Sequence, residues 1–361
     1  MNKKQLEFFF KYLKRDNLLA GPRREGCVLN FTEIDNINDI ELTNEIPLYS
    51  FKKFLLPQRE ILATSPNPSL SRRGTKGMAL VGLTVPDLKA ITILNQVFEK
   101  DPFYQDRMSR TLVVGYGEFP CEYNWIFAFR YEENVLEHIQ FDVFIIKETS
   151  PNLSLSNSQT TTNPSLARMG TRLKGGIYKV FTGSEDGKKI LDEFGYQRYE
   201  NVQYSGYIRE EGVEEKVKDL KKAMESLSSQ DKIFQDLGKK CIECGRCSII
   251  CPLCYCFCLT DGGNFNKQRH TSSACPDRLV PLKGRAKERM ATTCFYSEFS
   301  EIAVGHKFLK NPAERIYNWY EHKFLRFPEE FSVAGCVNCG RCAKVCPAGI
   351  NIREVINRIK N

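Results

Sequence analysis

The stretch CIECGRCSIICPLCYCFC, residues 241–258, places seven cysteines within eighteen positions. A second stretch, GCVNCGRCAKVCP at residues 335–347, closely repeats its first half. Both contain the spacing C-x2-C-x2-C-x3-C-P, in which a proline follows the fourth thiol. Cysteine thiolates with this spacing hold a [4Fe–4S] cube, so the sequence predicts iron–sulfur chemistry.

The spacing has a physical reason. Two residues between cysteines let the chain curl, so that three successive sulfurs reach three corners of one cube, and a turn then carries the fourth sulfur away. Gly245 and Gly340 follow the second cysteine of each run. Glycine adopts backbone angles that other residues avoid, so we expect these two residues to let backbone amides approach the cluster. The proline after the fourth cysteine suits the first turn of a departing helix.

Two runs predict two [4Fe–4S] clusters, and in such proteins the fourth cysteine of each run ligates the other cluster. We therefore expect the first cluster on Cys241, Cys244, Cys247 and Cys346, and the second on Cys336, Cys339, Cys342 and Cys251. The alternative is a pair of structural zinc sites in a zinc-stabilised interaction module. Zinc usually takes two C-x2-C pairs rather than a triplet with a Cys-Pro end, so the iron–sulfur interpretation is favoured.

Further cysteines follow the first run. Cys254, Cys256 and Cys258 alternate along the chain, and an extended backbone would point them to one side. Cys254 and Cys256 together with Cys294 form a candidate third metal site. The alternative is that these cysteines pack as small apolar groups. Cys275 lies in a polar stretch and is interpreted as a bystander.

The distribution of cysteines also indicates a domain boundary. Of the fifteen cysteines, only Cys27 and Cys121 precede residue 240, and 361 residues favour two domains. We expect an α+β protein, with an α/β partner-docking domain at 1–230 and a mainly helical two-cluster domain, like an α-helical ferredoxin, at 231–361. The two runs begin 95 residues apart (336 − 241), which suits a helical domain better than a compact ferredoxin.

Hydrophobic periodicity supports the α/β pattern in the first half. Residues 78–101 read as a short buried strand, a turn at Pro86 and an amphipathic helix, and the strand signal fades beyond residue 230. Further strands are predicted in residues 110–119, 140–148 and 175–183, and helices in 3–15, 185–194 and 210–227.

Two segments near residues 64–77 and 150–175 interrupt this pattern. NPSLSRRGT, from Asn67, and NPSLARMGT, from Asn163, share seven of nine positions. Both segments are rich in Pro, Ser, Asn and Gly and poor in large apolar groups. We interpret them as insertions between strands, the alternative being two turns that are similar by chance.

The composition limits the function classes. The first apolar stretch is interrupted by lysines, and no window approaches the roughly 20 apolar residues that a membrane span requires. We therefore expect a cytoplasmic protein without transmembrane segments, in which the cysteines are not disulfides. The formal charge of +8 falls by about four units if two clusters are bound. The basic residues are scattered, so no nucleic-acid partner is predicted.

No catalytic residues are predicted. The sequence contains no phosphate loop, nucleophile–base pair or paired carboxylates, and VVGYGEF at residues 113–119 carries only a lone G-x-G.

The C-terminal half of the chain resembles that of the sulfhydrogenase beta subunit family. The resemblance rests on the two cysteine runs and on two segments between them, TTCFYSEFSEIAVGHKF at 292–308 and PAERIYNWYEHKF at 312–324. The corresponding subunit of anaerobic sulfite reductase is a close relative of that family. The first half is similar more loosely, through residues 80–98 and 110–124. The family carries cysteines after the first of these strands, where this chain has Thr84, Val85 and Pro86, so no N-terminal cluster is predicted.

The resemblance implies an electron-transfer subunit with [4Fe–4S] clusters. Such subunits relay electrons between a flavin-containing NAD(P)H-binding partner and a catalytic partner, either a nickel–iron hydrogenase or a sulfite or sulfur reductase. The resemblance also implies that Cys254, Cys256 and Cys294 fall on family cysteines. The alternative is a reductase in its own right, with a third catalytic cluster at those extra cysteines.

Overall fold

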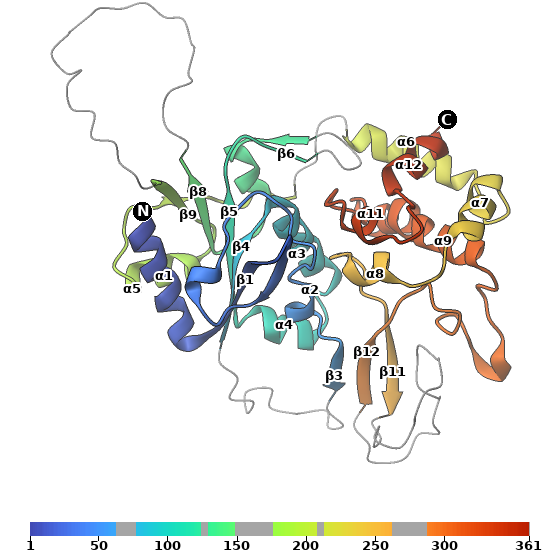
Figure 1. The fold of residues 1–361 in the computed structure, drawn as a ribbon, viewed down its shortest axis with the longest axis horizontal. Coiled ribbons are helices and arrows are strands. Elements are labelled where there is room, and N and C mark those ends of the chain that lie inside the picture. The colour runs from blue at the N-terminus through green and yellow to red at the C-terminus, as the bar shows by residue number, and fades with distance from the viewer. Residues whose placement is uncertain (63–76, 124–128, 149–175, 208–212, 262–286, 361) are drawn as a thin grey trace, which may run out of the picture.

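The computed structural model describes residues 1–361 except 63–76, 124–128, 149–175, 208–212, 262–286 and 361. The described strands of the first half form a seven-stranded sheet in the order β10-β9-β8-β5-β4-β1-β2 (Figure 1). Strands β1, β4, β5 and β8 run parallel, and β2 and β9 are antiparallel to their inner neighbours. The strands are β1 Asn17–Glu25, β2 Val28–Glu33, β4 Gly77–Leu83, β5 Thr111–Gly117, β8 Val143–Lys147, β9 Tyr178–Thr182 and β10 Glu200–Asn201.

Both faces of this sheet are covered. Alternate side chains of β4 point to opposite faces: Ala79 and Val81 pack with helix α1 (Lys3–Asp16), and Leu80 packs with α3 (Val85–Val97). Helix α5 (Glu185–Glu193) lies on the α1 face, and α4 (Pro102–Met108) lies on the α3 face (Figure 1). The α+β class is confirmed, and strands β4, β5, β8 and β9 and helices α1, α3 and α5 lie where the sequence predicted them. The sequence analysis did not predict strands β1, β2 and β10 or helix α4.

Helix α3 differs from the expectation in one respect. Its first ten residues, from Val85 to Leu94, are all buried, so it is not an amphipathic surface helix. Pro86 lies in its first turn and does not form a separate turn. The helix is buried on every side because it lies between the sheet and the cysteine-rich half of the chain (Figure 1).

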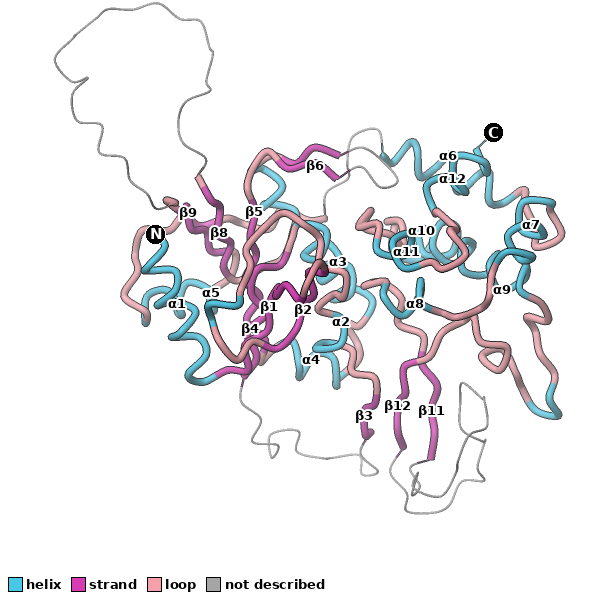
Figure 2. Tube along the Cα trace, viewed as in Figure 1, coloured by secondary structure: helices cyan, strands magenta, loops and turns pink. Residues whose placement is uncertain are grey.

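The second half is mainly helical, as predicted, and Figure 2 shows helices α6 to α12 gathered on the right of the view. Its core includes Leu220, Phe234, Trp319 and Ile356, which are buried. The helices are α6 Val213–Glu225, α7 Lys232–Lys240, α8 Arg246–Ile250, α9 Pro312–Glu321, the π-helical turn η6 His322–Arg326, α10 Phe327–Phe331, α11 Arg341–Val345 and α12 Ile352–Lys360. Because α6 packs against α12, the predicted division at residue 230 stays a prediction.

One sheet of the second half was missed by the sequence analysis. Strands β11 (Phe257–Asp261) and β12 (Lys287–Ala291) form an antiparallel pair, and β12 also pairs with β3 (Arg59–Leu62) of the first half. Figure 1 shows these three strands side by side below the two halves. The sequence of β12, KERMA, has no apolar alternation. Its charges instead form ion pairs across the strands, such as Glu288 with Arg59.

The remaining described elements are short. They are η1 Ile37–Asp39, α2 Lys52–Leu55, β6 Cys121–Tyr123, β7 Phe129–Tyr131, η3 Glu133–His138 and η5 Ala303–Gly305. Nearly all of both predicted insertions lies outside the described residues. Among the described helices, none has the length and apolar character that a membrane crossing needs.

Candidate metal centre

The two cysteine runs adopt the same backbone conformation. Glu243 and Asn338, which precede the second cysteine of each run, have positive φ angles of 55° and 56°. Gly245 and Gly340, which follow it, have φ angles of 67° and 69°. Each run then enters a short helix, α8 or α11, that ends at the fourth cysteine. The identical spacing thus produces two identical loops, and each loop uses glycine where only glycine adopts the angle at no cost.

The structure brings the fourth cysteine of the second run to the first run. One cavity is lined by Cys241, Cys244, Cys247 and Cys346, and Cys342 of the second run also lines it. The other lining side chains are mainly apolar and include Phe295, Ile316, Trp319 and Tyr320. The thiols predicted to hold the first cluster therefore surround one apolar cavity, and helices α8 and α11 pack together beside it.

The fourth cysteine of the first run lies correspondingly with the second run. Cys251 is close enough to Cys336, Cys339 and Cys342 to influence the pKa of each thiol. Burial is the largest effect, and it raises the pKa of Cys336 to about 12. Burial therefore keeps Cys336 protonated, and a coordinated metal would supply the positive charge that lets this thiol lose its proton.

Backbone donors around the sulfurs favour the thiolate form. The amide of Glu243 donates to Cys241 Sγ at 3.4 Å, and the amide of Ile350 donates to Cys346 Sγ at 3.3 Å. The amide of Asn338 likewise donates a hydrogen bond to the sulfur of Cys336. Gly245 has no room for a side chain, because a Cβ atom there would come within 2.5 Å of Thr293 Cγ2. Two sets of four thiols with amide donors are the donor chemistry of [4Fe–4S] clusters, so these residues fit the predicted groups.

The second run is surrounded by buried cations. Lys323, only 3% exposed, donates to Cys251 Sγ at 3.4 Å and to the carbonyl oxygen of Gly335 at 2.7 Å. Burial by itself lowers the pKa of Lys323, but the neighbouring thiolates, Cys251 first, raise it well above its usual value. The lysine is therefore held as a cation directly beside a predicted cluster ligand.

Arg341 fixes the second run against the first half of the chain. Its guanidinium is fully buried, lies 2.8 Å from Asp87 Oδ1 and donates to Pro47 O at 2.7 Å. Asn338 adds a hydrogen bond to Tyr123 O at 3.1 Å. Arg246, the equivalent arginine of the first run, is exposed. The two sites therefore differ: one is apolar and near the surface, and the other is buried among cations between the halves.

The extra cysteines lie near predicted ligands of both sites: Cys254 is next to Cys251, and Cys294 is near Cys247. Cys256 and Cys294 form a sulfur hydrogen bond, which lowers the pKa of Cys256 to about 7. Cys254 hydrogen-bonds with Cys251, and Lys52 Nζ donates to Cys254 O at 3.0 Å. Among the described residues, no group of three His, Cys, Asp or Glu side chains converges tightly enough to hold a single metal ion. The third metal site stays a prediction, and so does the role of the eight motif cysteines as cluster ligands.

The positions of the other cysteines are less informative. Cys258 lies on β11, Cys121 is buried in the core of the first half and Cys27 is exposed. Cys275 lies outside the described residues. Sequence reasoning missed Lys52, Lys323 and the pair formed by Arg341 with Asp87. The only sequence signal for the buried arginine was the CGRC motif. This motif occurs in both runs, although only Arg341 of the second run is buried.

Comparison with known proteins supports the iron–sulfur interpretation. A family model described as a 4Fe-4S dicluster domain matches residues 240–350. The chain is 24% identical over 364 residues to the sulfhydrogenase 2 subunit beta of Pyrococcus furiosus, with 98% of this chain and 95% of that protein covered. No solved structure matches the chain. Two predictions are confirmed: that this is an iron–sulfur protein, and that it resembles the sulfhydrogenase beta subunit.

Proposed function

We propose that this iron–sulfur chain is an electron-transfer subunit with two [4Fe–4S] clusters. It relays electrons between a flavin- and NAD(P)H-linked partner and a catalytic partner of the hydrogenase or sulfite or sulfur reductase type. The observation that supports this most is the exchange of fourth cysteines. Cys346 of the second run lines one cavity with Cys241, Cys244 and Cys247, and Cys251 of the first run lies with Cys336. Clusters held by interleaved ligands are close neighbours, as electron transfer requires.

When bound, each cluster supplies one-electron oxidation and reduction. The chain's own residues supply the rest: eight thiolates hold the groups, and amide hydrogens such as those of Glu243 and Ile350 stabilise the charge on sulfur. Trp319 and Tyr320 exclude water from the first site. Lys323 stabilises added negative charge at the second site.

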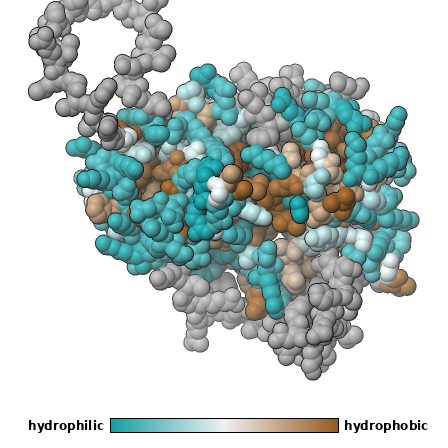
Figure 3. Space-filling view, viewed as in Figure 1, coloured by the Kyte–Doolittle hydropathy of each residue, from teal (hydrophilic) through white to brown (hydrophobic). Residues whose placement is uncertain are grey.

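The partners are proposed from the relative, whose name identifies it as part of a sulfhydrogenase. The chain itself contributes a surface on which the first site is accessible: Ile242, next to Cys241, is 65% exposed. In the view of Figure 3, hydrophilic residues cover most of the surface and hydrophobic residues gather toward the middle. A cytoplasmic location stays a prediction.

The second candidate function is a reductase in its own right. One observation favours it: Cys254 and Cys256 line a cavity of about 610 Å³, so the extra thiols are open to a small molecule. A substrate sulfur or a third cluster would then act at this position.

Electron counting distinguishes the two functions. The anaerobically purified chain is reduced with dithionite, freed of excess reductant and titrated with a one-electron viologen acceptor. A relay returns about two electrons per chain and does not consume sulfite or polysulfide. Continuous consumption of sulfite or polysulfide by the isolated chain with reduced viologen would instead support the reductase. Failure to store any electrons would overturn both proposals.

A further inference from the structure

A large cavity lies between the two halves of the molecule. Its volume is about 610 Å³, within the range of roughly 300–1,000 Å³ that is typical of small-molecule sites. The walls come from both halves: α2 and β3 from the first, and α8, the start of β11 and β12 from the second. The relay function proposed above does not use this cavity.

Cationic side chains dominate the polar lining. Among the described lining residues Glu60 is the only carboxylate, and Asp101 and Glu288 pair with the cations from outside the lining. Five cationic residues line the cavity, against these three carboxylates. The cations are Lys52, Lys53, Arg59, Arg107 and Arg289.

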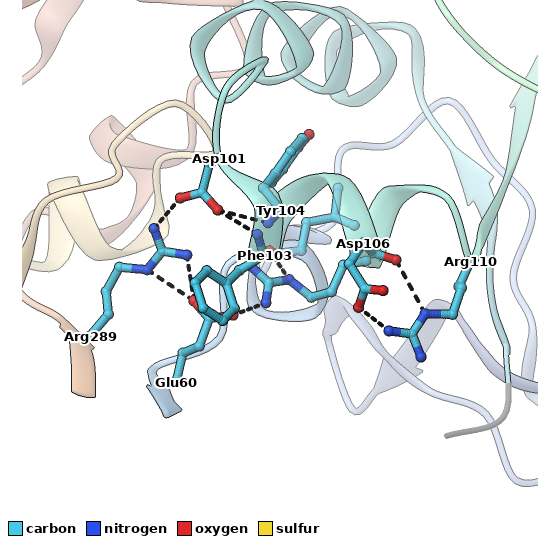
Figure 4. A network of polar contacts seen from close by, with 9 residues as sticks. Glu60, Asp101, Phe103, Tyr104, Asp106, Arg110 and Arg289 are labelled. Carbon is cyan, nitrogen blue, oxygen red and sulfur yellow. Dashed lines mark hydrogen bonds and ion pairs between the residues drawn. The ribbon is translucent and has the colours of Figure 1, made fainter. Parts of the chain in front are cut away.

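Figure 4 shows how part of this wall is held. Arg289 of β12 reaches Glu60 of β3, with its Nε donating to Oε2 at 2.9 Å, and also pairs with Asp101. Asp101 in turn accepts hydrogen bonds from the amides of Phe103 and Tyr104 at the start of α4. The wall is therefore a network of ion pairs and hydrogen bonds that joins the two halves.

Two buried polar atoms of the lining residues have no hydrogen-bond partner among the described residues. Arg107 donates through Nε to Leu55 O at 2.8 Å and pairs with Glu60 through Nη1, but its buried Nη2 has no hydrogen-bond partner. Thr292 Oγ1 is also buried and without a partner. Both atoms belong to residues that line the cavity, and a buried donor without a partner costs about 1–3 kcal/mol, which favours a polar ligand near these two residues.

The same cavity has an apolar part that is exposed. Tyr49 is 55% exposed, Phe257 is 42% exposed and Ile249 is 44% exposed, and all three line it. Exposed aromatic side chains in a concave wall are typical of a site that holds a flat ring. The cavity therefore combines exposed apolar side chains with cationic ones, and the Arg289 guanidinium lies 5.5 Å from the centre of the Phe257 ring.

The cavity adjoins the predicted redox centres. Cys254 and Cys256 line it, and Cys254 hydrogen-bonds with Cys251, a predicted ligand of the second cluster. We propose that this cavity binds a planar aromatic ligand with an anionic phosphate group, of the flavin mononucleotide class. The ring lies against Tyr49 and Phe257, and the phosphate faces Lys53 and Arg107. This site goes beyond the relay function, because it adds a ligand to the chain itself.

The test is a titration of the anaerobically purified full chain with flavin mononucleotide (FMN), followed by flavin fluorescence. We expect saturable binding of one FMN per chain. Two exposed lining residues provide variants that preserve the fold: Lys53→Met and Tyr49→Ala are each expected to weaken binding about tenfold, a loss of about 1.4 kcal/mol. Lys239→Met, which removes an exposed charge away from the cavity, is the control and leaves binding unchanged.

Two partial ligands test each half of the proposal. Lumiflavin has the ring without the phosphate, and adenosine monophosphate has a phosphate without the flavin ring, so both are expected to bind more weakly than FMN. Absence of saturable FMN binding, equal binding of adenosine monophosphate, or unchanged binding in both variants would overturn the proposal. Iron content is measured on the same samples, so loss of clusters is distinguished from loss of this site.

Discussion

The buried ammonium of Lys323 is expected to set the reduction potential of the second cluster. Replacing it in Lys323→Met removes one positive charge and keeps a side chain of similar length. Since reduction adds negative charge beside the lysine, the positive charge stabilises the reduced form. The variant should therefore have a lower potential at the cluster proposed for Cys336, Cys339, Cys342 and Cys251.

The size of the shift follows from the 3.4 Å between Lys323 Nζ and Cys251 Sγ. With an effective dielectric constant of about 20, two unit charges at this distance interact by about 5 kcal/mol. That value is a ceiling, because the added electron spreads over the whole cluster. A quarter to a half of it is about 1.3–2.5 kcal/mol, which corresponds to about 60–100 mV for one electron.

The assay is a redox titration followed by EPR, on samples matched for iron content. Lys344→Met is the control, because Lys344 is exposed and lies two residues from both Cys342 and Cys346. Solvent screens its charge, so its shift should stay below about 20 mV. An unchanged or raised potential in Lys323→Met at full iron content would refute the reasoning. An equal fall at both clusters would refute the local assignment.

Three further predictions concern the cysteines and the buried arginine. The Cys339→Ser variant should lose about half of the iron per chain, whereas Cys27→Ser, at an exposed position, should keep all of it. Full iron content in Cys339→Ser would contradict the ligand assignment. The Arg341→Met variant leaves the buried carboxylate of Asp87 without its ion-pair partner, so the free energy of unfolding should fall by about 3–5 kcal/mol in denaturant titrations. The control, Arg246→Met at the exposed equivalent position, should change it little. In the iron-free protein, burial raises the pKa of Cys336 from 9.0 to about 12, so the protonated thiol is favoured by folding. This contribution to the free energy of unfolding is complete below pH 9 and is lost as the pH rises from 9 towards 12. Thermal melts over this range should show a falling Tm, and a rising Tm would contradict the prediction.

The local features of the site were predictable from the sequence. The C-x2-C-x2-C-x3-C-P spacing dictates a loop, and the structure forms that loop twice with nearly equal φ angles at Gly245 and Gly340. The exchange of fourth cysteines was also predictable, because it belongs to the same motif. Helix α1 was predicted from Leu6, Phe9 and Leu13, which are buried on one face.

Features that depend on distant parts of the chain were not predictable. Arg246 and Arg341 occupy the same place in the motif, and only the packing against Asp87 makes the second one a buried ion pair. The sheet formed by β3, β11 and β12 was missed because its strands are held by ion pairs rather than by an apolar pattern. The cavity lies between the halves, so no single stretch of sequence contains it.

The central claim is that two [4Fe–4S] clusters are held close together by interleaved cysteines. It is tested most directly by measuring iron and acid-labile sulfide per chain in anaerobically purified protein, with EPR before and after reduction by dithionite. Two clusters predict about eight of each per chain and an EPR signal of two interacting clusters after reduction. About twelve would add a third cluster near Cys254 and Cys294. Zinc in place of iron, or about four irons with an isolated signal, would contradict the account.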